Sequence, residues 1–262
     1  MARAIYRGLV ESGFPAENIG VVDPSEAAQS AARASGLIRI AESATDADLS
    51  ADLIVLAVKP QITGIALSPL AHRISSTTTV LSIIAGINSA SLANLLGLPN
   101  DDAVVRSMPN TPALVGEGMT GLFSNSDQRA HGRILAERVM SAVGQCVWVS
   151  NESDLDLVTA ISGSGPAYFF LFMESLADAA VELGMSPQTA HQLSVQTALG
   201  AAKLAQTSDD GLAKLRENVT SPGGTTEQAI ESFEASELRA IVMSATRAAK
   251  KRSIELSEEF GL

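Results

Sequence analysis

The chain has 262 residues, which is long enough for one large domain or two ordinary ones. Apolar residues make up 46% of it, which is typical of a globular protein and excludes a disordered one. The net charge of −11 argues against a broad basic face that binds nucleic acid, and the single cysteine excludes a disulfide within the chain.

The first half of the sequence alternates between predicted helices and short apolar strands. We predict helices over residues 1–13 and 25–35, and strands over residues 19–22, 37–40, 53–58, 79–84 and 104–105. Cys146 lies in a further apolar stretch and is predicted to be a buried strand residue. Unbroken apolar runs separated by helices are typical of parallel strands buried on both faces. The pattern predicts an α/β fold with a Rossmann-like doubly wound domain over residues 1–152.

The second half loses its strand signal and carries helical periodicity over residues 156–184, 187–207 and 236–259. An all-helical domain over residues 153–262 is therefore expected. No uninterrupted apolar run reaches the roughly 18–20 residues of a membrane span, and the first residues have no signal-peptide pattern. We therefore expect a cytoplasmic protein that binds no membrane.

Two of the predicted strands end in turns that suit a ligand. One strand runs into Ala57-Val58-Lys59-Pro60-Gln61, and another runs from Ser82 into Ala85-Gly86-Ile87. Ligands of open α/β sheets bind outside the carboxyl ends of the strands, and small residues let backbone amides approach a cofactor. An ordinary turn with a solvated lysine explains the first segment equally simply, and many strands end in Ala-Gly.

Two further segments fall in the helical half. In Ser162–Tyr168, Pro166 suits the first turn of a helix, whose exposed amides would hold an anion, and a flexible capped helix start is the alternative. In Val219–Gln228, Thr225 and Gln228 match a capping box, and two glycines allow converging amides that bind a carboxylate or phosphate. A well-capped surface helix explains the capping alone. The three histidines stand too far apart for metal-ligand spacing.

A fifth segment, Val105–Ala113, contains Met-Pro-Asn-Thr-Pro. Together with the four segments above, in this order, it resembles the pyrroline-5-carboxylate reductase family. The resemblance covers essentially the whole chain. The resemblance implies an oxidoreductase acting on CH–NH groups, with an N-terminal nicotinamide-binding domain and a C-terminal helical domain that interlocks two subunits. It implies that 1-pyrroline-5-carboxylate is reduced to L-proline, the last step of proline biosynthesis, with NADPH as cofactor and NADH as the alternative. The expected assembly is a homodimer or a larger homo-oligomer built from dimers, without nucleic acid.

The resemblance also assigns site residues. Those expected to contact the cofactor are Met1, Ser25, Ala57, Val58, Lys59, Pro60, Ala85, Gly86 and Asn218. Those expected to bind the substrate are Glu152, Ser164, Gly223, Gly224, Thr225 and Thr226. Thr226 is the expected catalytic residue, because its hydroxyl would orient the ring nitrogen while the amides of residues 223–226 hold the substrate carboxylate.

The sequence departs from the family at its start. The family begins with a strand and a Gly-x-Gly-x-x-Ala loop, whereas Met1-Ala2 matches only the end of that loop. We expect about ten further residues upstream, judged from the length of a strand plus the loop, or else a shortened protein with impaired cofactor binding. Asp23 favours a ribose hydroxyl over a phosphate, Ser25 is close enough to serve a phosphate, and Ala44 replaces a frequent asparagine.

Three alternatives to the reductase stay open. The first is another imine or β-hydroxyacid oxidoreductase with the same architecture. The second is a non-catalytic dimeric remnant that binds a small carboxylate but no dinucleotide. The third is a helical interaction protein, which leaves the strand-end motifs unexplained.

Overall fold

A computed structural model describes residues 1–125 and 130–260. The chain divides into two compact units. We call Met1–Ser164 together with Ala249–Leu262 the α/β unit, and Gly165–Ala248 the helical unit. The predicted domain boundaries, 1–152 and 153–262, rest on sequence pattern and stay a prediction.

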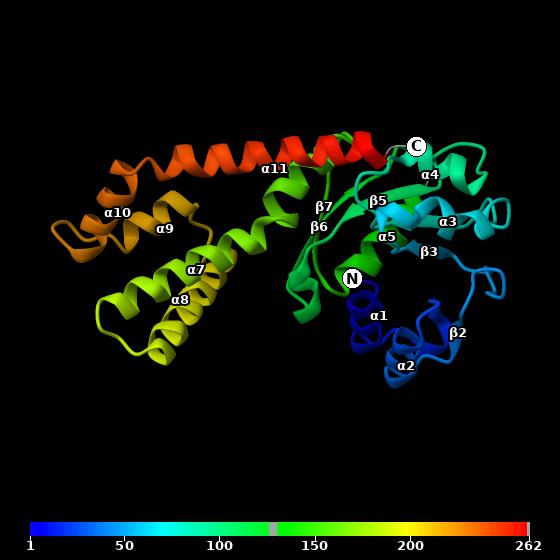
Figure 1. The fold of residues 1–262 in the computed structure, drawn as a ribbon, viewed down its shortest axis with the longest axis horizontal. Helices are drawn as coiled ribbons and strands as arrows, with labels where there is room; N and C mark the ends of the chain where they lie inside the picture. Colours follow the sequence, from blue (N-terminus) through cyan, green and yellow to red (C-terminus); the bar gives the residue numbers. More distant parts are fainter. Residues whose placement is uncertain (126–129, 261–262) are drawn as a thin grey trace. The chain divides into compact units, whose positions relative to one another are not determined.

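The α/β unit alternates helices and strands along most of its length (Figure 1). Its helices are α1 (Ala2–Glu11), α2 (Glu26–Ala34), α3 (Thr63–Leu67), α4 (Ser89–Leu96), α5 (Ala130–Ser141) and α6 (Asp154–Val158). Its strands are β1 (Gly20–Val22), β2 (Arg39–Ala41), β3 (Leu53–Leu56), β4 (Thr79–Ser82), β5 (Val104–Met108), β6 (Gly118–Phe123) and β7 (Gly144–Trp148). Its short 3-10 helices are η1 (Ala16–Asn18), η2 (Pro60–Ile62), η3 (Ser68–Leu70) and η4 (Thr111–Val115).

The strands form two sheets. One is the parallel pair β1-β2, and the other has five strands in the order β3-β4-β5-β6-β7. In the larger sheet β3, β4 and β5 are parallel, β6 runs antiparallel to β5, and β7 is parallel to β6. The predicted strands are confirmed, although β3 ends at Leu56 rather than at Val58, β4 ends at Ser82 rather than at Ile84, and β5 extends to Met108. The antiparallel β6 was not expected, and its short connection from β5 explains its direction, since parallel neighbours need a longer crossover.

Alternate residues of the larger sheet face two separate cores, as in a doubly wound domain. Leu81, Val105 and Leu122 pack in one apolar cluster with side chains of α1 and α5. Val80, Val104 and Leu56 pack in a second cluster on the other side, with side chains of α3 and α4. The predicted Rossmann-like architecture is therefore confirmed, with helices covering both faces of the sheet.

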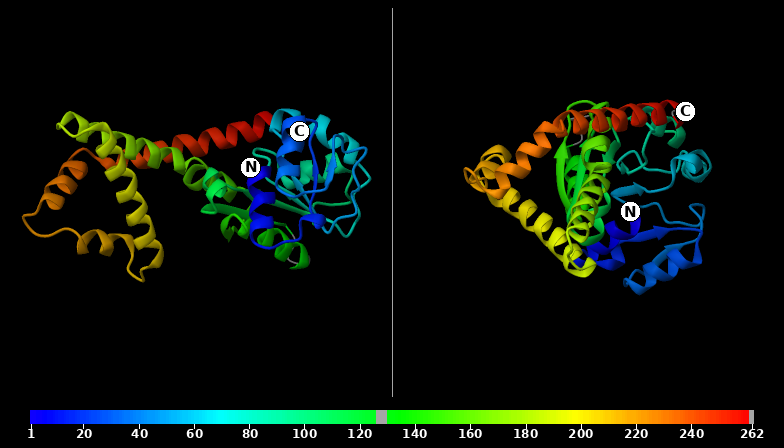
Figure 2. Two further views of the ribbon diagram at one scale, coloured as in Figure 1. Left: turned by 90° about the horizontal axis from the view of Figure 1, so that it is seen from below. Right: turned by 60° about the vertical axis from the view of Figure 1, so that its left-hand side comes forward.

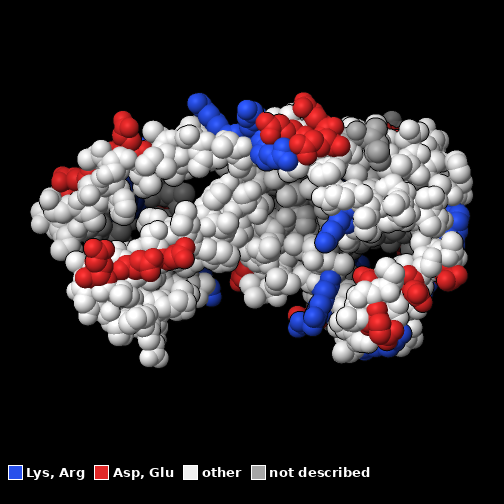
Figure 3. Space-filling model, viewed as in Figure 1, with Lys and Arg blue, Asp and Glu red and all other residues white. Residues whose placement is uncertain are grey.

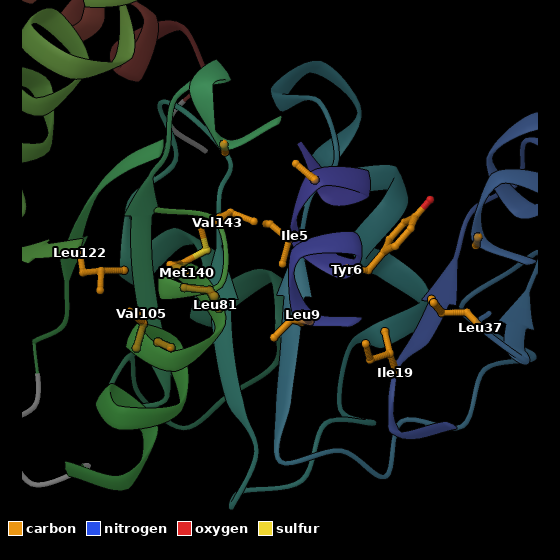
Figure 4. Close-up of a cluster of buried hydrophobic side chains, with 14 residues drawn as sticks. Ile5, Tyr6, Leu9, Ile19, Leu37, Leu81, Val105, Leu122, Met140 and Val143 are labelled. Carbon is orange, nitrogen blue, oxygen red and sulfur yellow. The ribbon is translucent and has the colours of Figure 1, made fainter. Parts of the chain in front are cut away.

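No strand of the described residues joins the two sheets. Each of β1 and β3 has a strand partner on one side only, β2 and β4 respectively. Apolar side chains of α1 connect the two parts (Figure 4). Figure 4 shows Ile5 pointing toward Val143, whereas Tyr6 lies on the side of Leu37. Among the described residues, β1 and β3 are therefore edge strands of separate sheets.

The helical unit is built from α7 (Gly165–Glu182), α8 (Pro187–Thr207), α9 (Leu212–Asn218), α10 (Thr225–Ala235) and the start of α11 (Leu238–Phe260). Helices α7 and α8 lie side by side (Figures 1 and 2). The start of α8 is set by Pro187 in its first turn and by the Ser186 hydroxyl, which accepts from the N–H of Thr189. Many large apolar side chains of this unit are exposed, including Phe169, Phe170 and Leu171 of α7.

One helical stretch among the described residues, Asp154–Glu182, is long and apolar enough to cross a membrane by length and composition. Polar residues interrupt it, so the search for uninterrupted apolar runs missed it. Only 17% of its most apolar window is buried within the chain. A single helix of this kind is weak evidence for a membrane span, because helices of water-soluble proteins pass the same test.

Candidate functional site

The two predicted strand-end turns come together at one edge of the larger sheet. Residues 57–60 follow β3, and Ala85 and Gly86 follow β4, its parallel neighbour, with Leu56 paired to Ser82 in the register. Ala57, Lys59 and Ala85 are exposed there. The two turns therefore lie next to each other at the carboxyl edge, where doubly wound sheets bind ligands.

Met1 and Ser25 occupy helix starts in the same unit. Met1 is the N-cap of α1, no side chain caps this helix, and its first turn contains no acidic residue. Unpaired first-turn amides and the positive end of the helix dipole favour an anion such as a pyrophosphate. Ser25 is the exposed N-cap of α2, and its N–H donates to Oδ1 of Asp23 at 2.8 Å. The two residues weighed for cofactor choice are therefore hydrogen-bonded to each other.

Glu152 is held by two residues far from it in sequence. Its Oε1 accepts from the N–H of Ser89 at 2.7 Å and from the Ser89 hydroxyl at 2.8 Å. The same oxygen lies 3.2 Å from Nη1 of Arg106, whose side chain is only 13% exposed. Ser89 begins α4, just after the Ala85–Gly86 turn, and Arg106 lies in β5. The Glu152 carboxylate therefore connects the start of α4 to β5.

The glycine loop before α10 differs from the predicted capping box. The N-cap of α10 is Gly224, with no side-chain cap, so Thr225 is already the first helical residue. The amide of Gly223 instead donates to Oε2 of Glu227 at 2.7 Å, and that of Gly224 to the carbonyl of Ser221. The capping box of Thr225 with Gln228 was wrong, because the helix begins one residue earlier than that motif requires.

This hydrogen bonding changes which amides of the loop are free to bind a substrate. The amides of Gly223 and Gly224 already have acceptors within the chain. Those of Thr225 and Thr226 lie in the first turn, where a helix provides no carbonyl four residues back. Asn218 ends α9, and its side-chain amide donates to Asp210 at 3.2 Å.

Ser164 lies between a π-helical turn and Gly165, the first residue of α7. Residues Thr159–Gly163 form a π-helical turn that continues α6 into α7, and the amide of Ser164 donates to the carbonyl of Thr159 at 2.8 Å. Pro166 lies in the first turn of α7, as predicted, whereas the Ser164 amide before it already has an acceptor within the chain. Hydroxyl groups help to satisfy the backbone here, since Thr159 and Ser162 donate to carbonyls four residues back.

Two polar residues near these groups, Arg106 and Asn110, were not predicted from the sequence. The Asn110 side chain donates to the carbonyl of Ser162 at 3.0 Å and accepts from the amide of Met119 at 2.9 Å. Both residues lie in the Met-Pro-Asn-Thr-Pro region, which was singled out without a role for either side chain. Their hydrogen-bonding partners are distant in sequence. The motif was therefore the only feature of the sequence that could have pointed to these two side chains.

Charges elsewhere on the described surface are mixed. Figure 3 shows Lys and Arg side chains on the viewed face in small groups, interspersed with Asp and Glu. Among the described residues, no group of three or more His, Cys, Asp or Glu is placed to hold a metal ion.

Comparison with known proteins decides the family. Residues 152–256 match the family described as pyrroline-5-carboxylate reductase dimerisation, and residues 1–86 match NADP oxidoreductase coenzyme F420-dependent. The pyrroline-5-carboxylate reductase of Pseudomonas aeruginosa is 44% identical over 261 residues, which cover 100% of this chain and 95% of that protein. The chain belongs to the pyrroline-5-carboxylate reductase family.

Solved structures of pyrroline-5-carboxylate reductases have the same fold. That from Coxiella burnetii has a TM-score of 0.91 and 39% identity, covering 97% of this chain and 94% of that one. That from Plasmodium falciparum, solved with NADP bound, has a TM-score of 0.82 and 32% identity, covering 97% and 93%. Within this family frame, all cofactor candidates except Asn218 fall in residues 1–86, and all substrate candidates fall in residues 152–256.

Proposed function

We propose that the chain reduces 1-pyrroline-5-carboxylate to L-proline, the last step of proline biosynthesis, with NADPH as cofactor and NADH as the alternative. The observation that carries the proposal is the pair of adjacent turns, Ala57–Pro60 and Ala85–Gly86, at the carboxyl ends of β3 and β4. They stand in a chain that matches reductases of this name along its whole length.

The residues at this edge of the sheet fit a nicotinamide dinucleotide. Ala57 and Ala85 are exposed and carry no bulk that would block a flat ring or ribose. Exposed Lys59 offers a positive charge, and the uncapped start of α1 offers amides for the pyrophosphate. When bound, the reduced dinucleotide supplies a hydride to the imine carbon, and the C=N double bond becomes a C–N single bond.

The substrate carboxylate is assigned to the start of α10. The amides of Thr225 and Thr226 and the positive end of the helix dipole favour an anion there. The Thr226 hydroxyl then accepts from the protonated ring nitrogen and orients it. No strong acid is needed, because an imine that is protonated before it binds already has the proton that the product amine keeps.

Glu152 is the second group assigned to the substrate. Its Oε1 accepts from Ser89 and Arg106, which fixes the carboxylate before a ligand arrives. A group held in this way costs less entropy to order on binding than a free side chain.

We further propose a homodimer in the cytoplasm. The exposed apolar side chains of α7 and α8 fall in the region that matches the dimerisation family. A second subunit would remove this apolar surface from water, which is the main driving force of association. The cytoplasmic location rests on the single cysteine and on the biosynthetic reaction.

The test of this function is NADPH consumption with a panel of substrates. The proposal predicts turnover with 1-pyrroline-5-carboxylate, release of L-proline, and no turnover with acyclic β-ketoacids, the oxidised partners of β-hydroxyacids. Turnover with the acyclic compounds instead would assign the chain to another oxidoreductase with this architecture. The same assay with NADH in place of NADPH shows which of the two cofactors the chain uses more efficiently.

The break between β1 and β3 favours a second candidate, a dimer that binds a small carboxylate without a dinucleotide. Titration with NADPH separates the two candidates. Saturable binding supports the reductase. Binding of L-proline, a carboxylate of the substrate's size, without any binding of NADPH supports the second candidate.

A further inference from the structure

The Ala85–Gly86 turn is in contact with the C-terminal end of α11. Gly86 has a φ of 78°, in the left-handed region that favours glycine. A Cβ atom placed on it would lie 3.2 Å from the carbonyl oxygen of Leu256 and 3.5 Å from Cα of Ser257. The backbone of α11 therefore lies directly against one side of this turn.

Four residues on one face of α11 make or anchor this contact, and we call them the Gly86-contact face: Ser253, Leu256, Ser257 and Phe260. Their spacing of three, one and three residues places them along a single stripe of the helix.

Anchors lie on both sides of the contact. On one side, the Ser253 hydroxyl donates to Oδ1 of Asp156 at 2.7 Å. On the other, Phe260 packs against the apolar cluster that contains Ile84 and Ile87, which flank the turn in sequence. Away from this face, Arg252 pairs with Glu255 and Glu259. The helix end is thus fixed to the α/β unit by its inner face.

We infer that the Gly86-contact face is a positioning element that holds the Ala85–Gly86 turn in the shape that receives the nicotinamide dinucleotide. The inference rests on the proposed role of this turn in cofactor binding. A turn held on one side by a helix is already in its binding conformation, and releasing it lowers the fraction of chains competent to bind. The measured affinity falls in proportion to that fraction. Ser253 and Phe260 act through the turn, whereas Ala85 and Gly86 face the ligand.

The experiment measures steady-state kinetics of the full chain and the Kd of NADPH for Phe260→Ala. If the competent fraction falls to about a tenth, the KM and Kd for NADPH rise about tenfold, while kcat at saturating NADPH stays within about twofold. Phe260→Leu restores most of the affinity, because it refills the apolar contact. Ile254→Ala, which deletes an exposed side chain outside the face, is the matched control and leaves both constants unchanged.

Each outcome decides the question. An unchanged KM for NADPH in folded Phe260→Ala overturns the inference, and so does a loss of thermal stability with no specific effect on NADPH. If Phe260→Ala does not fold, Ser253→Ala takes its place and is expected to raise the same two constants. If the unaltered chain neither binds NADPH nor reduces the imine, the proposed function fails first, and that result is distinct from a failure of this inference.

Discussion

At the start of α10, the Gly223 amide donates to Glu227 of the same loop. A substrate carboxylate that needs this amide would have to displace Glu227, whereas the amides of Thr225 and Thr226 have no such competitor within the helix. The sequence correctly placed glycines and threonines before a helix. It did not reveal that Gly224 is the N-cap, because Thr225 and Gln228 match a capping box and only the backbone path shows where the helix begins.

Thr226→Val tests the expected catalytic hydroxyl. The change keeps the side-chain shape and removes one hydrogen bond to a charged nitrogen, which is worth about 1.5–3 kcal/mol. We expect kcat/KM for the imine to fall about tenfold to a hundredfold. Thr207→Val is the control, since the Thr207 hydroxyl bonds only to carbonyls of its own helix. Full kcat/KM in Thr226→Val would remove the hydroxyl from the mechanism.

The Cys146 thiol makes the free energy of unfolding depend on pH. Partial burial raises the pKa of the Cys146 thiol above its ordinary value, against an opposing effect of the hydrogen bond from the Ser141 hydroxyl. The unfolded chain therefore loses this proton at lower pH than the folded chain. The resulting stabilisation is fully present below the unfolded pKa and is lost as pH rises through the folded pKa.

The same shift is measurable as thiol reactivity. At one mildly alkaline pH, iodoacetamide should label Cys146 more slowly in the folded chain than in urea, because the thiolate is the reacting form. Cys146→Ser removes the labelling and serves as the blank. Equal rates in both states would contradict the raised pKa.

Elements could be predicted from the sequence where a local pattern of residues encodes them. The strands β3 and β4 and the turns after them were predicted because unbroken apolar runs end in small residues. Strand β6 was missed because Gly118 and Gly121 interrupt its apolar pattern. The pairing of Arg106 with Glu152, which are 46 residues apart, could not be predicted because no local pattern encodes a contact between distant residues.

The Arg106–Glu152 pair should matter more for stability than a surface pair. Arg106→Met leaves a poorly exposed carboxylate without its cation, and we expect the free energy of unfolding to fall by about 1.5–3 kcal/mol. The control is Arg7→Met, which breaks the exposed Arg7–Glu11 pair and should cost about 0.5 kcal/mol or less. Urea unfolding of both variants measures the difference. Equal losses would show that burial adds nothing to the pair.

The free edges of β1 and β3, each paired on one side only, make a second element-scale prediction. A designed strand and Gly-x-Gly loop joined in front of Met1 should pair with both strands, raise Tm and tighten NADPH binding. The control is the same extension with prolines at alternate positions, which cannot form the ladder. If both extensions gave the same Tm and the same Kd, the space between β1 and β3 would not accept a strand.

At the scale of the whole molecule, the exposed apolar surface of the helical unit indicates that another protein subunit covers it. Phe169, Phe170 and Leu171 of α7 are each more than 60% exposed within one chain. Composition predicted a globular protein but not this surface, because helical periodicity cannot tell a face covered by the same chain from one covered by another.

A charge on this surface should weaken the dimer. We expect Leu171→Glu to shift the chain toward monomer in sedimentation velocity at low micromolar concentration, because a buried unpaired carboxylate opposes association. Ile65→Glu, at a still more exposed apolar residue of the α/β unit, is the control and should leave the sedimentation coefficient unchanged. A dimer unaffected by Leu171→Glu would place the interface elsewhere.

The central claim is that hydride passes from a nicotinamide to the imine carbon of a cyclic amino acid. The most direct measurement supplies NADPH deuterated at the transferring carbon of the nicotinamide and follows the label into the product by mass spectrometry and NMR. The account predicts L-proline with one deuterium at the former imine carbon. Unlabelled proline, or deuterated NADPH left unconsumed by folded chain with saturating imine, would contradict it.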